Sequence, residues 1–78
     1  MIGRVVHYYD RIGVAILELK APLVVGELVT FKRGDREFTQ PVSSMQINQA
    51  SVEKAKRGDV VGVKVVQVAD NGTLAFRA

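Results

Sequence analysis

The residues 13-GVAILELK-20 carry the clearest structural signal in this chain of 78 residues. Ala15, Leu17 and Leu19 occupy alternate positions, so in an extended segment their side chains point to one side. Glu18 points to the other side, which gives the period of two residues that is typical of a strand with one buried face. The stretch therefore predicts a half-buried β-strand and favours an all-β fold.

On both sides of this stretch, turn-forming residues divide the chain into short segments rich in Val, Ile and Leu. Their regular spacing is typical of a sheet meander or a barrel. No segment has the composition of a linker, so residues 1–78 are predicted to form a single domain. The turn signals are Asp10-Arg11, Ala21-Pro22, Arg33-Gly34-Asp35, Asn48 to Ser51, Arg57-Gly58-Asp59 and Asp70-Asn71-Gly72.

Two further signals shape the predicted strands. Pro41 interrupts the long segment 36–48, and because proline has no N–H to donate, we expect a bend at this point. Asn71-Gly72 predicts a type I′ turn, since both residues accept a positive φ, and this turn would fold residues 73–77 back on the preceding strand.

Residues 51–56 form the only helix-like stretch. Ser51 is a suitable N-cap and Gly58 a suitable stop beyond the last turn, so we predict one short helical turn here. About six strands then remain for the rest of the chain. A small sheet with a bulky aliphatic interior avoids exposed edges by closing on itself, so the predicted fold is an all-β, six-stranded closed barrel.

Composition narrows the setting and the class of partner. The chain has no cysteine, which excludes disulfides and thiolate metal sites and agrees with a reducing, cytoplasmic location. It lacks a signal-peptide pattern and any apolar run near the roughly 20 residues of a membrane span, so we expect a soluble protein without membrane contact. The net charge of +3 favours a polyanionic partner or serves solubility.

Five motifs follow one another along nearly the whole chain: Gly3-Arg4-Val5, 12-IGVA-15, 23-LVVGELV-29, 42-VSSMQI-47 and 55-AKRGDVVGV-63. This order resembles the second domain of translational GTPases such as elongation factor Tu. The longer stretches HYYDRIGVAILEL, FTQPVSSMQI and VEKAKRGD are more similar still to small stand-alone elongation-factor-like proteins and to the carboxy-terminal barrels of U32 peptidases. The resemblance implies a barrel of the type shared by elongation factors and some reductases.

The resemblance also implies contact with RNA. In elongation factor Tu this domain helps to hold the aminoacyl end of tRNA, and in related GTPases it contacts ribosomal RNA. The first barrel strand of that family carries an acidic pair followed by an aromatic residue, whereas residues 4–7 here are Arg-Val-Val-His. The phosphate-cradling GxxxxGK(S/T) loop is absent, so we expect this chain alone to bind no nucleotide and no cofactor.

Basic residues gather near two predicted connections. If barrel closure brings these connections to one end, they form a patch that contacts RNA phosphates without reading sequence. The alternative is an ordinary solvated charge pattern, because Asp35, Glu37, Glu53 and Asp59 are interleaved with the cations. The candidate RNA-binding residues are Lys32, Arg33, Arg36, Lys54, Lys56 and Arg57.

The first predicted strand offers a possible pocket made by Arg4, His7, Tyr8 and Tyr9. His7 is the only histidine, and between two tyrosines it could stack on a base or an aminoacyl group, or simply lie at a barrel end. A lone histidine without nearby acidic ligands predicts no metal site. No serine is framed by a base and an orienting group, so we expect no catalytic residues and no enzyme activity.

Two functional hypotheses follow. The first is a translation-related module that contacts tRNA, ribosomal RNA or a ribonucleoprotein through a basic barrel end. The second is a protein-interaction barrel that positions a partner such as a U32-type peptidase. An exposed apolar patch around Tyr8, Tyr9 and residues 23–25, without a coherent basic surface, would favour the second.

Overall fold

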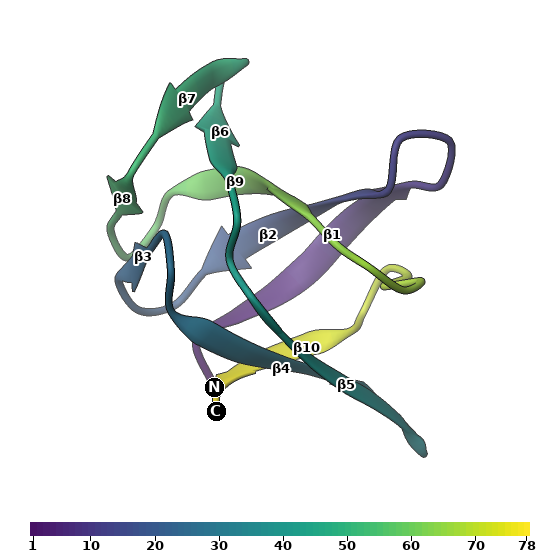
Figure 1. The fold of residues 1–78 in the computed structure, drawn as a ribbon. Helices are drawn as coiled ribbons and strands as arrows, with labels where there is room; N and C mark the ends of the chain where they lie inside the picture. Colours follow the sequence, from purple (N-terminus) through teal and green to yellow (C-terminus); the bar gives the residue numbers. More distant parts are fainter.

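The computed structural model describes residues 1–78 (Figure 1). β-Strands are its only regular secondary structure, which confirms the all-β class. No helix in it is long and apolar enough to cross a membrane. The strands are β1 (Gly3–Tyr9), β2 (Val14–Leu19), β3 (Leu23–Val24), β4 (Leu28–Arg33), β5 (Arg36–Pro41), β6 (Met45–Ile47), β7 (Ala50–Val52), β8 (Lys54–Ala55), β9 (Val60–Lys64) and β10 (Leu74–Arg77).

Eight strands form one antiparallel sheet in the order β5-β4-β10-β1-β2-β9-β6-β7, and β3 pairs separately with β8. β2 lies inside the sheet, paired with β1 on one side and with β9 on the other. Ala15, Leu17 and Leu19 are buried, as the alternation predicts, and Leu17 lies opposite Val5 and Val61.

The prediction of a closed, six-stranded barrel needs correction. The hydrogen-bonded order begins at β5 and ends at β7, and no backbone ladder joins these ends. Pro41 ends β5, and residues 42–44 cross to β6 without a ladder of their own. A buried side chain links β5 to the end of β9 instead: Gln40 Nε2 donates to the Lys64 carbonyl, and Gln40 Oε1 accepts from the Val66 N–H, both at 2.8 Å.

The predicted helical turn at 51–56 is also wrong. Val52 pairs with Met45 in β7, and Ala55 pairs with Leu23 in β8, so this segment is extended. The β6–β7 hairpin and the pairing of β8 with β3, which is distant in the sequence, outweigh the local capping pattern, because helix propensity is only a weak preference. The predicted stop at Gly58 becomes a turn before β9, with a φ of 92°.

The turn at Asn71-Gly72 exists, but it is not a type I′ hairpin. Only Gly72 has a positive φ, of 91°, whereas a type I′ turn needs two such residues. The turn folds onto β1, where the Gly72 N–H donates to the Val5 carbonyl. The left-handed pair lies instead at Asn48 and Gln49, with φ of 50° and 67°, in the turn that joins β6 to β7.

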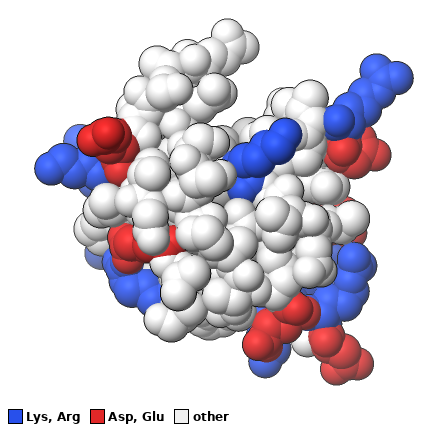
Figure 2. Space-filling view, in the orientation of Figure 1, with Lys and Arg blue, Asp and Glu red and all other residues white.

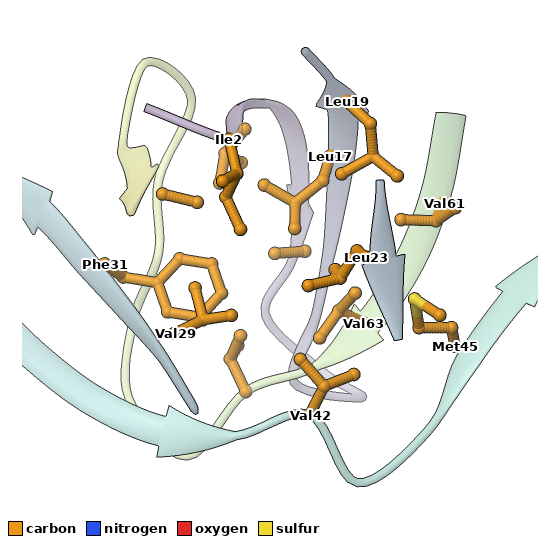
Figure 3. Close-up of a cluster of buried hydrophobic side chains, with 14 of the residues drawn as sticks. Ile2, Leu17, Leu19, Leu23, Val29, Phe31, Val42, Met45, Val61 and Val63 are labelled. Carbon is orange, nitrogen blue, oxygen red and sulfur yellow. The ribbon is translucent and has the colours of Figure 1, made fainter. Parts of the chain in front are cut away.

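The inner face of the curved sheet is filled by aliphatic side chains that point toward one another (Figure 3). Phe31 is fully buried, and its ring stacks on that of Phe38 with 5.1 Å between centroids. Because packing occupies this face, a binding surface must lie on the outer face or at the hairpins. The two termini lie together, away from the β6–β7 hairpin, which projects from the body (Figure 1).

Candidate functional site

The most pronounced hollow lies on the outer face of β2 and β9, at Gly62. Glycine has no side chain, so this position is empty in a row of outward-facing side chains. Gly62 lies opposite Ile16 of β2 and opposite Gln46 of β6. A Cβ atom at Gly62 would lie 3.4 Å from Val14 Cγ1 and 3.5 Å from Ile16 Cδ1. The missing side chain therefore leaves a floor bounded by aliphatic groups.

Two hairpins extend this hollow into a groove of about 570 Å³, here called the β2–β9 groove. The loop between β1 and β2 contributes an apolar rim, and the β6–β7 hairpin contributes side-chain amides. The lining residues are Tyr9, Ile12, Val14, Ile16, Gln46, Asn48, Gln49, Val60, Val61 and Gly62.

No charged residue lines the groove, although 24% of the chain is charged. Ile12 is 57% exposed and Tyr9 and Val60 are each 49% exposed, so apolar surface meets water here. Figure 2 shows mainly uncharged residues between the projecting hairpin and the rest of this face, with one basic side chain near the middle of the view and most other charges toward the periphery. Exposed, adjoining apolar residues of this kind are typical of interaction surfaces.

A carboxylate lies at the margin of the groove, next to Val60. Glu18 lies opposite Val60 in the β2–β9 ladder. Lys20 Nζ donates to Glu18 Oε1 at 2.8 Å, and this hydrogen bond, together with the positive charge of Lys20, lowers the pKa of the Glu18 carboxyl. The Glu18 charge is therefore already paired within the chain, whereas the ammonium of Lys64, at the Ile12 edge of the groove, donates to the Ile12 carbonyl at 2.6 Å.

A bulge in β1 decides which aromatic side chain reaches the groove. The register slips between Val5 and His7, so that Val5 points into the core while His7 and Tyr9 lie on the outer face. The rings of His7 and Tyr9 meet edge to face with 4.3 Å between centroids. Bulges commonly re-aim side chains in this way.

The structure does not gather the four predicted pocket residues into one pocket. Tyr9 lines the β2–β9 groove, and His7 lies beside it. Tyr8 points the other way and packs against the core. Arg4 borders a separate shallow hollow beside Gly72.

The candidate RNA-binding residues also fall into two separate groups. Lys32, Arg33 and Arg36 surround the β4–β5 turn, whereas Lys54, Lys56 and Arg57 lie in and after β8, near the start of β4 (Figure 1). The length of β4, roughly 17 Å at 3.3 Å per residue, separates the groups. None of the six takes part in the chain's ion pairs, Lys20–Glu18 and Arg77–Glu27.

Sequence reasoning missed most of the groove. Val14 and Ile16 share the outward parity of Glu18, so the residues of GVAILELK are apolar on both faces at the start of the strand. That second apolar face is a signal that could have found the site. Residues 23–25, expected to join an apolar patch with the tyrosines, do not line the groove, and Leu23 is fully buried.

Comparisons with known proteins point to peptidases. No family model matches the sequence. The chain is 39% identical over 76 residues to an uncharacterized protease of Methanocaldococcus jannaschii, an alignment that covers 96% of this chain. It covers only 19% of the protease, so the chain spans about a fifth of that relative's length.

Two solved structures share the fold. The crystal structure of the C-terminal domain of a candidate U32 peptidase from Geobacillus thermoleovorans has a TM-score of 0.94 at 18% identity, covering 100% of this chain and 91% of that domain. Its selenomethionine variant has a TM-score of 0.91 at 20% identity, covering 99% and 96%. The resemblance to U32 carboxy-terminal barrels is thus confirmed for the fold, whereas the resemblance to translational GTPases gains no support.

Proposed function

We propose that this chain is a non-catalytic binding domain that docks, through the β2–β9 groove, onto the peptidase portion of a U32-type peptidase. The observation that carries the proposal is the uncharged groove on a chain that aligns, over nearly its full length, with one part of a protease. The first expectation, RNA binding through one basic end, requires the basic residues to lie at a single end of the molecule. They fall into two separate groups instead.

Burial of the groove supplies a driving force for docking. Ile12, Tyr9 and Val60 each expose about half of their surface. Removing an aliphatic or aromatic side chain fully from water contributes about 1.5–3 kcal/mol. A few such residues at the centre of an interface commonly provide most of its binding free energy.

The site also fits a docking role better than a chemical one. Its polar groups are the amides of Gln46, Asn48 and Gln49 and the hydroxyl of Tyr9. Carboxamides donate and accept hydrogen bonds but do not ionise near neutral pH. The groove therefore offers mainly hydrogen-bonding groups, which suit the orientation of a polypeptide.

A chimera tests the proposal. This chain replaces the aligned segment of the M. jannaschii protease, and amide hydrogen exchange is compared between the chimera and the isolated chain. Ile12 and the Asn48-Gln49 turn rim the groove from two loops, so docking should slow exchange of their amides at least about tenfold. The β4–β5 turn at Gly34, remote from the groove, should exchange equally fast in both.

Matched variants separate docking from general effects. Ile12→Asp places a charge in the groove and should abolish the added protection, because a desolvated carboxylate without a partner is costly. Val66→Asp makes the same change at a residue that is 73% exposed outside the groove, and should leave the protection intact. Equal exchange in the chimera and the isolated chain would contradict the proposal.

A further inference from the structure

We infer that the hollow over Gly62 receives one aliphatic side chain of the docked partner, and that Gly62 is the residue that determines this specificity. The inference rests on the proposed function and adds to it the chemistry of the segment that binds. It concerns an uncharged, extended stretch of the partner's polypeptide.

The backbone does not require glycine at position 62. Five glycines of the chain have a positive φ, but Gly62 is not one of them. Inside a strand, glycine is destabilising relative to alanine, because it has more conformational freedom to lose. Glycine in a strand often marks a place where another chain or a ligand approaches closely, which here points to the space above β9.

The surroundings of Gly62 suit an aliphatic group. The position of a Cβ at Gly62 is within van der Waals distance of Val14 and Ile16, at 3.4 Å and 3.5 Å, and the carbonyl of Gln46 lies 4.0 Å away on the third side. A methyl group of the partner cannot take the Cβ position itself, which is at bonding distance from the Gly62 Cα, but it can lie about 3.5–4.0 Å above that Cα. There it would contact the two aliphatic side chains, which is the packing found in protein interiors.

The wall formed by the β6–β7 hairpin fits the backbone of such a segment. Gln46, Asn48 and Gln49 line the groove, and a carboxamide side chain offers both donors and acceptors to a peptide bond. Gln49 holds a φ of 67°, a conformation that glycine adopts at less cost. A glutamine at this position thus provides an amide to the groove at the expense of turn stability.

The uncharged lining of the groove disfavours charged side chains as occupants of the hollow. A lysine, arginine or carboxylate of the partner would find no opposite charge among the lining residues. Burying it unpaired is unfavourable, whereas an aliphatic side chain gains from leaving water. The occupant is therefore a Leu, Ile, Val or Met side chain on an uncharged segment.

Substitution of Gly62 by a larger residue, which fills the hollow with a side chain of this chain, tests the inference. Gly62→Ala and Gly62→Val should leave the melting temperature of the isolated chain unchanged or raise it, because both residues suit a strand better than glycine. In the chimera, Gly62→Val should lower the amide protection of the Ile12 loop and the Asn48-Gln49 turn by about tenfold or more. Gly62→Ala, with a single methyl, should have a smaller effect in the same direction.

A control and the outcomes distinguish this inference from the proposed function. Thr30→Val replaces a hydroxyl with a methyl group at an outward position of β4, and so adds apolar surface outside the groove; it should leave protection unchanged. Loss of protection with Ile12→Asp but not with folded Gly62→Val or Gly62→Ala would overturn the inference and leave docking through the groove in place. No protection in the unmodified chimera would overturn both.

Discussion

At the scale of single residues, the buried side chain of Gln40 is unusual because it hydrogen-bonds to backbone groups in the manner of a neighbouring strand. It is 5% exposed, and its carboxamide donates to the carbonyl of Lys64, the last residue of β9, and accepts from the N–H of Val66, two residues further on. A peptide group of a neighbouring strand would offer the same donor and acceptor. The side chain thus takes the place of the ladder that Pro41 and the crossing after it do not form.

Gln40→Leu should therefore destabilise the protein by about 1–3 kcal/mol, because two backbone groups lose their partner while the volume stays similar. For a domain of this size, each kcal/mol lowers the melting temperature by about 4–8 °C. Thermal unfolding followed by circular dichroism measures the shift. Gln67→Leu, an exposed glutamine nearby, is the control and should change stability by less than about 0.5 kcal/mol. Equal melting temperatures for the two variants would contradict this role of Gln40.

At the scale of elements, the β6–β7 hairpin combines strain with exposure. Its turn holds two residues other than glycine in the left-handed region, and only β6 connects it to the rest of the sheet. A type I′ turn prefers glycine at its second position. The hairpin is thus less stable than the same turn with Asn-Gly would be.

Gln49→Gly should relieve this strain and stabilise the protein by about 1 kcal/mol, visible as a rise of the melting temperature. Gln49→Ala removes the same amide but keeps a side chain at the positive φ, so it should not stabilise. In the chimera both variants should weaken the protection of the groove loops, since both lack the carboxamide. If Gln49→Gly melts no higher than Gln49→Ala, the turn is not strained.

Elements that depend on local chemistry were predictable from the sequence, and elements that depend on distant partners were not. The inner face of β2 and the bend at Pro41 follow from alternation and from a missing N–H. β7 pairs with the adjacent β6 through the Asn48-Gln49 turn, but the capping pattern that starts at Ser51 favoured a helix there. β8 forms because it meets β3, and no local pattern contains that information. The groove was missed for the same reason, since it needs β1, β2, β6 and β9 side by side.

At the scale of the whole molecule, the arrangement of charge sets an expectation for RNA. The two basic groups lie at opposite ends of β4, so one RNA strand at either end meets about three cations. Binding falls with salt by a slope of about 0.7–0.9 per neutralised phosphate on logarithmic axes. We therefore expect weak tRNA binding with a slope no steeper than about −3 between 50 and 200 mM salt. A slope near −5, measured by fluorescence anisotropy, would mean that both groups contact the same RNA.

The adjacent termini and the projecting hairpin give the molecule two distinct ends (Figure 1). A chain that continues from Met1 or Ala78 leaves near one end, whereas the β6–β7 side of the groove lies toward the other. In a longer peptidase, docking through the groove would therefore require the domain to fold back onto the preceding portion or to contact another molecule. Either arrangement buries the groove, and the two differ in whether the contact is made within one chain.

Site-specific crosslinking tests the central claim most directly. Tyr9 in the chimera is replaced by the photoreactive residue p-benzoylphenylalanine, and crosslinked peptides are identified by mass spectrometry. From this position in the groove we predict crosslinks to an uncharged, aliphatic segment of the peptidase portion, and few from the same label at exposed Val66. Crosslinks that arise from position 66 as readily as from position 9, or none to the peptidase from position 9, would contradict the account.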